Sequence, residues 1–150
     1  MLVSYKPADR QCVVPYLVVP DADKEIAFIT TVFKAKAVQV FRDPEGVVRH
    51  AEIKIGDAIV MLAQSGVKWP PIAAAIYAYV PDVDAVYERA VKAGVSSPRP
   101  PADQPYGDRN CGVTDANGVQ WWITTHVEDV SEAEMHRRDA ELLEKGVKSL

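Results

Sequence analysis

The chain has 150 residues, enough for one domain with a hydrophobic core, and its 48% apolar and 25% charged residues are the balance of a globular protein rather than a disordered one. Its formal net charge of −4, with no run of lysines or arginines, argues against nucleic-acid binding. The first residues lack the layout of a signal peptide and no apolar run reaches membrane-spanning length, so we expect a cytoplasmic protein with no membrane partner and with Cys12 and Cys111 reduced.

The first half of the chain predicts one strand, one helix and then three further strands. Residues 1–11 look irregular, and residues 13–19 are a strand candidate. The acidic segment at 20–23 then precedes apolar residues spaced three and four apart, which predicts a capped amphipathic helix. Turns rich in glycine, proline and aspartate separate the three short strands that follow, at residues 38–41, 47–55 and 58–63.

The same pattern then starts again. Residues 16–23 and 77–84 share a tyrosine, a valine, a proline and two aspartates at a constant offset of 61. Residues 83–91 have the spacing of a second amphipathic helix, which Gly94 is placed to end. At the same offset, the strand expected at 50–55 aligns in sequence with residues 111–116, and the strand expected at 58–63 aligns with residues 119–124. We therefore expect two copies of a strand–helix–three-strand unit, which decides the fold.

The segment 106–126 carries the strongest local signal. Two strands are expected at 109–114 and 119–125, joined by a turn that ends in Asn117-Gly118, a pair that tolerates positive φ and marks a hairpin. The second strand contains adjacent tryptophans, Trp121 and Trp122. Since neighbouring strand residues point to opposite faces, one indole should enter the core and the other should face whatever lies across the sheet.

Three segments lie outside the repeat. Residues 64–71 hold Trp69 in a stiff, proline-containing linker, and residues 95–106 contain four prolines, which predicts an extended loop or an edge strand. Residues 131–146 begin with the spacing of a capping box and predict a charged terminal helix. Its large apolar residues form a thin stripe, suited to lying on a surface or a partner subunit: Met135, Leu142, Leu143 and Val147.

The tandem repeat resembles the vicinal oxygen chelate superfamily, which contains glyoxalase I, bleomycin-resistance proteins and extradiol dioxygenases. Within it, the chain is most similar to the PhnB-like bacterial branch. The likeness covers about residues 12–140. It rests on Pro-Tyr-Leu-Val-Val at 15–19, His-Ala-Glu-Ile-Lys-Ile-Gly-Asp at 50–57, Met-Leu-Ala at 61–63, Tyr-Gly-Asp-Arg at 106–109, Asp-Ala-Asn-Gly-Val-Gln-Trp-Trp-Ile at 115–123 and Thr-His-Val-Glu-Asp-Val-Ser at 125–131.

The resemblance implies an α+β fold in which two βαβββ modules curl mixed sheets around a cleft and helices cover the convex faces. We therefore expect a single domain over residues 1–150, with module 1 at about 12–64, module 2 at about 74–126 and the terminal helix after them. Superfamily members commonly complete the cleft across a homodimer, so a homodimer is expected here. Two departures leave the packing of the first helix open: Lys34 replaces the usual glycine, and Phe28-Ile29 replaces an aromatic pair.

Metal-using members hold a divalent ion with side chains from the first and last strands of both modules. Carried onto this sequence by the resemblance, those positions are Val14, Met61, Ala75 and Trp122. None offers a nitrogen or carboxylate ligand, and a thioether serves only soft metals. We therefore expect no metal and no cofactor, unless the positions are misplaced by one residue.

Strand alternation would turn several aromatic and polar side chains toward the cleft together with Val14 and Ala75. Such a wall suits a flat aromatic ligand, since ring stacking adds about 0.5–1.5 kcal/mol per pair beyond area burial. The alternative is that these aromatics fill the interior. The predicted ligand-binding residues are Tyr16, Met61, Trp69, Tyr77, Tyr79, Gln120, Trp122 and Thr124.

Three residues are weak catalytic candidates. Glu52 and His50 share the polar face of their strand and could act as an acid–base pair, although solvated pairs of this kind are common. At the offset of 61, Cys111 repeats the position of His50, and Arg109 on the same face could acidify its thiol. The alternative for Cys111 is a small buried hydrophobe.

These features favour a metal-free, sequestration-type protein that binds a small aromatic or drug-like molecule. One alternative is a glyoxalase-like isomerase or lyase that uses an unpredicted metal site or an acid–base pair such as Glu52 and His50. Another is an interaction protein whose terminal helix mediates assembly. The residues leave open whether catalysis occurs and which molecule is bound.

Overall fold

The two halves of the chain build one four-stranded sheet each. The computed structural model describes residues 3–147. The first sheet takes β1 (Tyr16–Val19), β2 (Lys36–Arg42), β3 (Val48–Ile55) and β4 (Ala58–Gln64), with α1 (Ala22–Val32) between β1 and β2. The second takes β5 (Ala75–Tyr79), β6 (Ser96–Asp103), β7 (Asp108–Thr114) and β8 (Gln120–His126), with α2 (Val83–Lys92) between β5 and β6. The helix α3 (Glu132–Glu144) follows.

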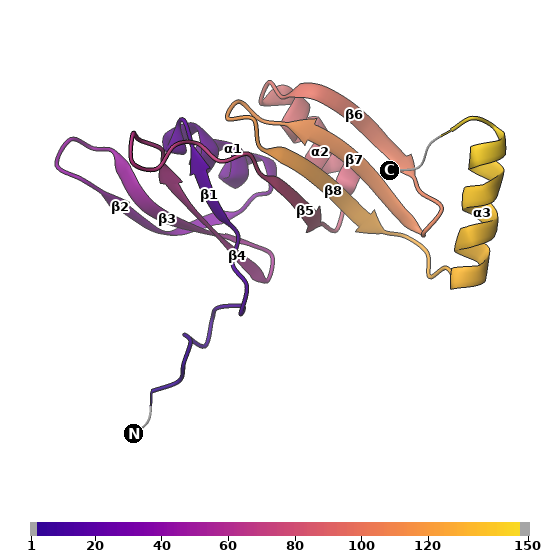
Figure 1. Cartoon of the computed structure of the whole chain (residues 1–150), viewed down its shortest axis with the longest axis horizontal. Helices are drawn as coiled ribbons and strands as arrows, with labels where there is room; N and C mark the ends of the chain where they lie inside the picture. Colours follow the sequence, from indigo (N-terminus) through magenta and orange to yellow (C-terminus); the bar gives the residue numbers. More distant parts are fainter. Residues whose placement is uncertain (1–2, 148–150) are drawn as a thin grey trace.

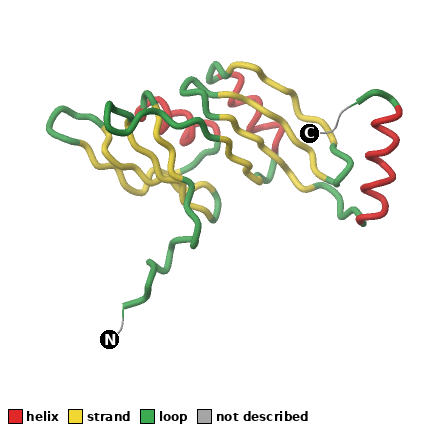
Figure 2. The backbone as a smooth tube through the Cα atoms, viewed as in Figure 1, coloured by secondary structure: helices red, strands yellow, loops and turns green. Residues whose placement is uncertain are grey.

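Both sheets have the same mixed topology. Their strand orders are β1-β4-β3-β2 and β5-β8-β7-β6. The pairs β1–β4 and β5–β8 are parallel, and the other neighbouring pairs are antiparallel. Figures 1 and 2 show the two sheets side by side, with α1 and α2 behind them. The α+β class and the two βαβββ repeats expected from the sequence are therefore confirmed.

One hydrophobic core runs behind both sheets. Trp121 is fully buried in it, as alternation along β8 predicts for one of the two tryptophans. The ring centroids of Phe28, within α1, and of Phe33, directly after it, lie 6.0 and 5.0 Å from that of Trp121. Burying a large apolar side chain contributes about 1.5–3 kcal/mol. These contacts between α1 and β8 therefore hold the two modules together.

Equivalent aspartates begin the first two helices. The side chain of Asp21 accepts a hydrogen bond from the backbone N–H of Lys24, and that of Asp82 accepts one from Ala85, both at 3.0 Å. Beyond the end of α1, Lys34 has φ of +50°, in the left-handed region that favours glycine. The lysine therefore adopts the conformation for which the superfamily's usual glycine is suited.

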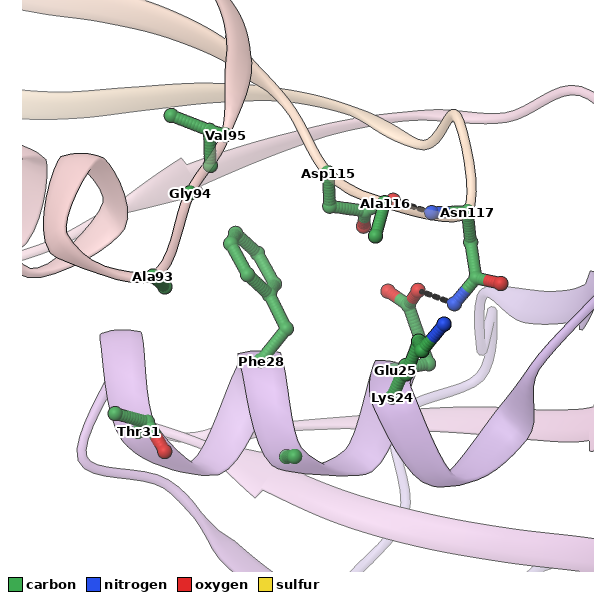
Figure 3. Close-up of a pocket in the computed structure, with 11 residues that line it drawn as sticks. Lys24, Glu25, Phe28, Thr31, Ala93, Gly94, Val95, Asp115, Ala116 and Asn117 are labelled. Atoms are coloured by element: carbon green, nitrogen blue, oxygen red, sulfur yellow. Dashed lines mark hydrogen bonds between the residues drawn. The ribbon is translucent and has the colours of Figure 1, made fainter.

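A polar network joins the two modules beside α1. Asn117, in the turn between β7 and β8, donates from Nδ2 to the carbonyl of Asp21 at 2.9 Å and accepts at Oδ1 from the N–H of Asp21 at 2.8 Å. Its Nδ2 also donates to the carboxylate of Glu25 at 2.8 Å. Figure 3 shows the bond between Asn117 and Glu25 among the residues that line a cavity. The cavity has a volume of about 380 Å³. The Asn-Gly turn thus joins β7 to β8, and its asparagine also connects module 2 to α1.

Glu25 is fully buried in this network. Its second oxygen, Oε1, has no hydrogen-bond partner among the residues described. Burial, and then the nearby Asp115 carboxylate, raise the pKa of Glu25 to about 8. Asp115 is itself held by the Trp121 indole N–H at 2.8 Å. Glu25 is therefore mostly protonated at neutral pH in the folded protein.

The strand β6 and the helix α3 lie at the periphery of the molecule. The proline-rich segment forms β6, an edge strand, where missing N–H donors are tolerated. The helix α3 lies beyond the second sheet in Figure 1, and its Arg138 and Leu142 line a hollow together with Asp103 at the end of β6. Arg138 ties it to Glu128 through an ion pair at 2.8 Å. Over the same residues, the helices are too short or too polar to cross a bilayer.

Candidate functional site

Each sheet leaves the face opposite the helices open, and the strand register places side chains on it in rows. In module 1, one row runs from Tyr16 through Met61 to Glu52. The equivalent row in module 2 runs from Tyr77 through Trp122 to Gly112 and Arg99. We call these surfaces open face 1 (Tyr16, His50, Glu52 and Met61) and open face 2 (Tyr77, Tyr79, Arg99, Asp108, Asn110, Gly112, Gln120 and Trp122).

Open face 1 brings together both members of the predicted acid–base pair. Nε2 of His50 lies 3.3 Å from Oε1 of Glu52, and Nδ1 lies 3.3 Å from the Tyr16 hydroxyl. The other oxygen of Glu52 forms an ion pair with Arg10, from the segment before β1. Both oxygens of this buried carboxylate therefore have a protein partner.

The segment before β1 is fixed to open face 1 by a second residue. The side-chain amide of Gln11 donates to the carbonyl of Ile59 at 2.6 Å and accepts from its N–H at 3.2 Å. This backbone-like pairing sets the path of the chain so that Arg10 reaches Glu52. The predicted irregular lead-in is therefore part of the wall around Glu52.

Open face 2 is built around Trp122. Its indole lies across Gly112 of the neighbouring strand, where an added Cβ would lie only 2.5 Å from Cζ3 of the ring. The guanidinium carbon of Arg99, on the next strand, lies 5.2 Å from the ring centroid. The absent side chain at Gly112 is therefore what allows the indole to lie over the sheet toward Arg99.

Asp108 organises the other end of open face 2. Its Oδ2 accepts from the hydroxyls of Tyr79 at 3.0 Å and Tyr77 at 3.4 Å, and its Oδ1 lies 2.7 Å from Nδ1 of His126. The bond to Asp108 raises the pKa of Tyr79 to about 12. Hydrogen bonds to Asp129 and then to Asp108 raise the pKa of His126. The Tyr79 hydroxyl therefore remains a neutral donor at physiological pH. The rings of Tyr77 and Tyr79 stay exposed.

The remaining predicted ligand-binding residues differ in accessibility. Gln120 is exposed at the start of β8, and Trp69 is exposed in the linker, outside both sheets. Met61 is half-buried. Thr124 is fully buried, and its hydroxyl accepts from Nδ2 of Asn110 at 2.5 Å. Thr124 thus supports Asn110 and presents no free hydroxyl on the surface.

Two hollows adjoin the open faces. One of about 270 Å³ is lined by Arg99, Gly112, Gln120 and Trp122 on open face 2. Another of about 270 Å³ lies between the β3–β4 turn and β5, against Tyr77 and Tyr79. Most of the predicted aromatic residues therefore border open space instead of filling the interior.

The position of Cys111 corrects the sequence alignment of the two modules. Cys111 lies opposite Ile123, and Ala51 lies opposite Leu62. Since β4 and β8 keep the offset of 61, β3 and β7 must be offset by 60, and Cys111 repeats Ala51 rather than His50. A slip of one residue reverses the face of every side chain. Cys111 is therefore buried in the core, where burial raises the pKa of its thiol to about 11.

The four positions that the resemblance assigns to the metal ligands, Val14, Met61, Ala75 and Trp122, carry side chains that do not suit a divalent ion. Tyr16 lies opposite Met61 and Tyr77 lies opposite Trp122, so the equivalence of Met61 and Trp122 holds in the register. Valine, alanine and indole side chains have no lone pair to offer, and the methionine thioether is too soft for such ions. Elsewhere in residues 3–147, no group of three or more His, Cys, Asp or Glu side chains is placed to hold a metal.

Comparison with known proteins agrees with the tandem sheets. The family model described as the Glyoxalase/Bleomycin resistance protein/Dioxygenase superfamily matches residues 11–123. The chain belongs to this superfamily. An uncharacterised protein from Mycobacterium bovis is 31% identical to this chain over 142 residues. The match covers 87% of this chain and 91% of that protein.

Solved structures of the superfamily fold match as well. TioX from Micromonospora sp. ML1 has a TM-score of 0.66 and 26% identity, covering 78% of this chain and 99% of its own. The fosfomycin resistance protein FosX from Mesorhizobium loti has a TM-score of 0.57 and 21% identity, covering 83% of this chain and 95% of its own. Both place this chain in the superfamily fold.

Superfamily membership explains the repeated sheets. Sequence reasoning missed four residues that lie on the open faces or contact them: Arg10, Arg99, Asp108 and Asn110. Arg10 and Arg99 lie in segments without hydrophobic periodicity. Asp108 and Asn110 share a face with Gly112, and counting back from Trp122 with the correct register would have placed them there.

Proposed function

We propose that the protein binds a small aromatic molecule on its open faces without a metal, in a sequestration or resistance role. The observation that carries the proposal is open face 2, where an indole and two tyrosine rings border open space instead of the core. The network around Asp108 restrains Tyr77 and Tyr79, so their rings are ordered before a ligand arrives. Such a rigid aromatic surface suits stacking, at about 0.5–1.5 kcal/mol per ring pair.

We also propose a homodimer in which a second copy covers the open faces. Three aromatic side chains on these faces have large exposed fractions: Tyr16 at 49%, Tyr77 at 48% and Tyr79 at 64%. A monomer rarely exposes so many large apolar groups together. Dimers that complete the cleft are common in the superfamily. We also propose that the protein belongs to the PhnB-like branch and is cytoplasmic.

Tryptophan fluorescence with a panel of aromatic compounds tests the binding proposal. We expect at least one compound to quench the emission at micromolar concentration, and Trp122→Leu to abolish the saturable part. Trp69→Phe, in the exposed linker, is the matched control and should leave the affinity unchanged. Quenching that survives Trp122→Leu but disappears in Trp69→Phe would refute the proposed site.

An enzyme is the second candidate, and the contacts between His50, Glu52 and Tyr16 favour it. These groups form a hydrogen-bonded chain on an open face, an arrangement that can transfer a proton in general acid–base catalysis. A glyoxalase-type isomerase activity that is lost in Glu52→Gln would establish this candidate. Stoichiometric zinc, nickel, manganese or iron in the purified protein would likewise overturn the metal-free proposal.

A further inference from the structure

Arg99 is the cation of open face 2 that lacks an anionic partner. Within residues 3–147, every arginine except Arg89 and Arg99 lies within 4.0 Å of a carboxylate. Arg89 has a structural role, because its Nε donates to the carbonyl of Val32 near the end of α1 at 2.8 Å. Arg99 instead meets a neutral amide, with Nη2 donating to Oδ1 of Asn110 at 2.6 Å.

The other nitrogens of Arg99 are left without an acceptor. Nε is buried and has no hydrogen-bond partner among the described residues. The guanidinium lies against the Trp122 ring, 5.2 Å from its centroid, and this contact supplies no oxygen. A guanidinium carries five N–H donors in a planar fork that matches a carboxylate. The arrangement is therefore oriented and incompletely satisfied.

The hollow beside Arg99 combines an aromatic ring with polar side chains. It measures about 270 Å³ and is lined by Arg99, Trp122 and the exposed amide of Gln120. Asp108, the carboxylate of open face 2, forms no ion pair with Arg99 and instead contacts Tyr79 and His126. An indole and a guanidinium with unfilled hydrogen-bonding capacity therefore both line this hollow.

We propose that the ligand of open face 2 is a planar aromatic carboxylate, whose ring packs against Trp122 and whose carboxylate accepts hydrogen bonds from Arg99. This inference rests on the proposed binding function and adds the charge of the ligand. The carboxylate supplies the acceptor that Arg99 lacks within the chain, while Asn110 and the indole hold the guanidinium in place.

Calorimetric titration with three probes of one shape tests the charge: 2-naphthoate, neutral 2-naphthamide and cationic 2-naphthylmethylammonium. The wild type should bind naphthoate at least about tenfold more tightly than naphthamide, as expected for a charge-assisted hydrogen bond. It should bind the cation most weakly, and rising salt should weaken naphthoate alone. Arg99→Gln should remove the preference for naphthoate while leaving naphthamide binding in place, and Arg99→Lys should keep part of it.

The outcomes separate this inference from the function on which it rests. Equal affinity of the wild type for naphthoate and naphthamide would overturn the inference and leave aromatic binding intact. No heat from any probe, in a protein that also fails to bind the wider aromatic panel, would overturn the proposed function itself. If Arg99→Gln fails to fold, the two wild-type affinities and the salt dependence decide the question alone.

Discussion

Trp122 and Gly112 depend on each other across two neighbouring strands. An added Cβ at Gly112 would lie 2.5 Å from Cζ3 and 2.9 Å from Cε3 of the indole, so the ring must move if Gly112 becomes alanine. We expect Gly112→Ala to cost about 1–3 kcal/mol of stability through overpacking. It should also weaken aromatic binding by about two- to tenfold, the scale of one lost ring contact.

Denaturant unfolding and ligand titration of Gly112→Ala check this expectation together. Gly66→Ala is the matched control, because Gly66 has ordinary φ and nothing within 4 Å of an added Cβ. Unchanged ligand affinity in a folded Gly112→Ala protein would mean that the orientation of the indole does not matter for binding.

Glu25 should make the stability of the protein depend on pH. Its pKa is raised to about 8 in the folded state, so the folded state binds a proton more tightly than the unfolded state does. Stability is then greatest below the unfolded pKa and is lost as pH rises toward 8. From pH 5 to pH 8 the loss attributable to this group is on the order of 3 kcal/mol.

Glu25→Gln should flatten that pH profile, because the amide keeps an acceptor for Asn117 and carries no proton to lose. Denaturant unfolding of both proteins between pH 5 and pH 8.5 measures the difference. Parallel profiles would show that the Glu25 carboxyl ionises normally in the folded protein.

At the level of elements, local patterns predicted what depends on local spacing. The strands, the first two helices and the separation of Trp121 from Trp122 all follow from period and alternation. The face of Cys111 did not, because it depends on the register between β7 and β8, where the turn is longer than that between β3 and β4. Aligning the two modules at a single offset of 61 hides this one-residue difference. The difference nevertheless moves every side chain of the strand to the opposite face of the sheet.

Long-range polar contacts were also beyond prediction from local pattern. Asn117 was expected only as a turn residue, yet its side chain reaches Asp21 and Glu25 in the other module. Arg10 reaches Glu52 from a segment with no regular pattern. Such contacts depend on how whole modules pack, which spacing within one module does not encode.

The terminal helix α3 should contribute little to the stability of the sheets. It has no fully buried residue, and its connection is the ion pair of Arg138 with Glu128. Changing Met135, Leu142 and Leu143 together to serine should shift the free energy of unfolding by less than about 0.5 kcal/mol, as for other surface positions. The same variant should keep the wild-type mass in solution. A loss of assembly would instead support the interaction-protein hypothesis for this helix.

At the scale of the whole molecule, the open aromatic faces predict self-association. Sedimentation analysis should give twice the chain mass of 16.5 kDa at micromolar concentration. Tyr79→Glu, on open face 2, should favour the monomer, since it places a charge in the proposed interface. Val91→Glu is the matched control, because Val91 is similarly exposed on α2, behind the sheet. A wild-type protein that stays monomeric at high concentration would contradict this arrangement.

The most direct measurement is the indole N–H spectrum of the three tryptophans during titration with 2-naphthoate and 2-naphthamide. Trp122 lies on open face 2, Trp121 is buried on the opposite face of the same strand, and Trp69 is exposed in the linker. We predict a saturable shift of the Trp122 signal with at least one probe, while the signals of Trp121 and Trp69 stay in place. Movement of Trp69 alone, or no movement of Trp122 at millimolar probe, would contradict binding at this face.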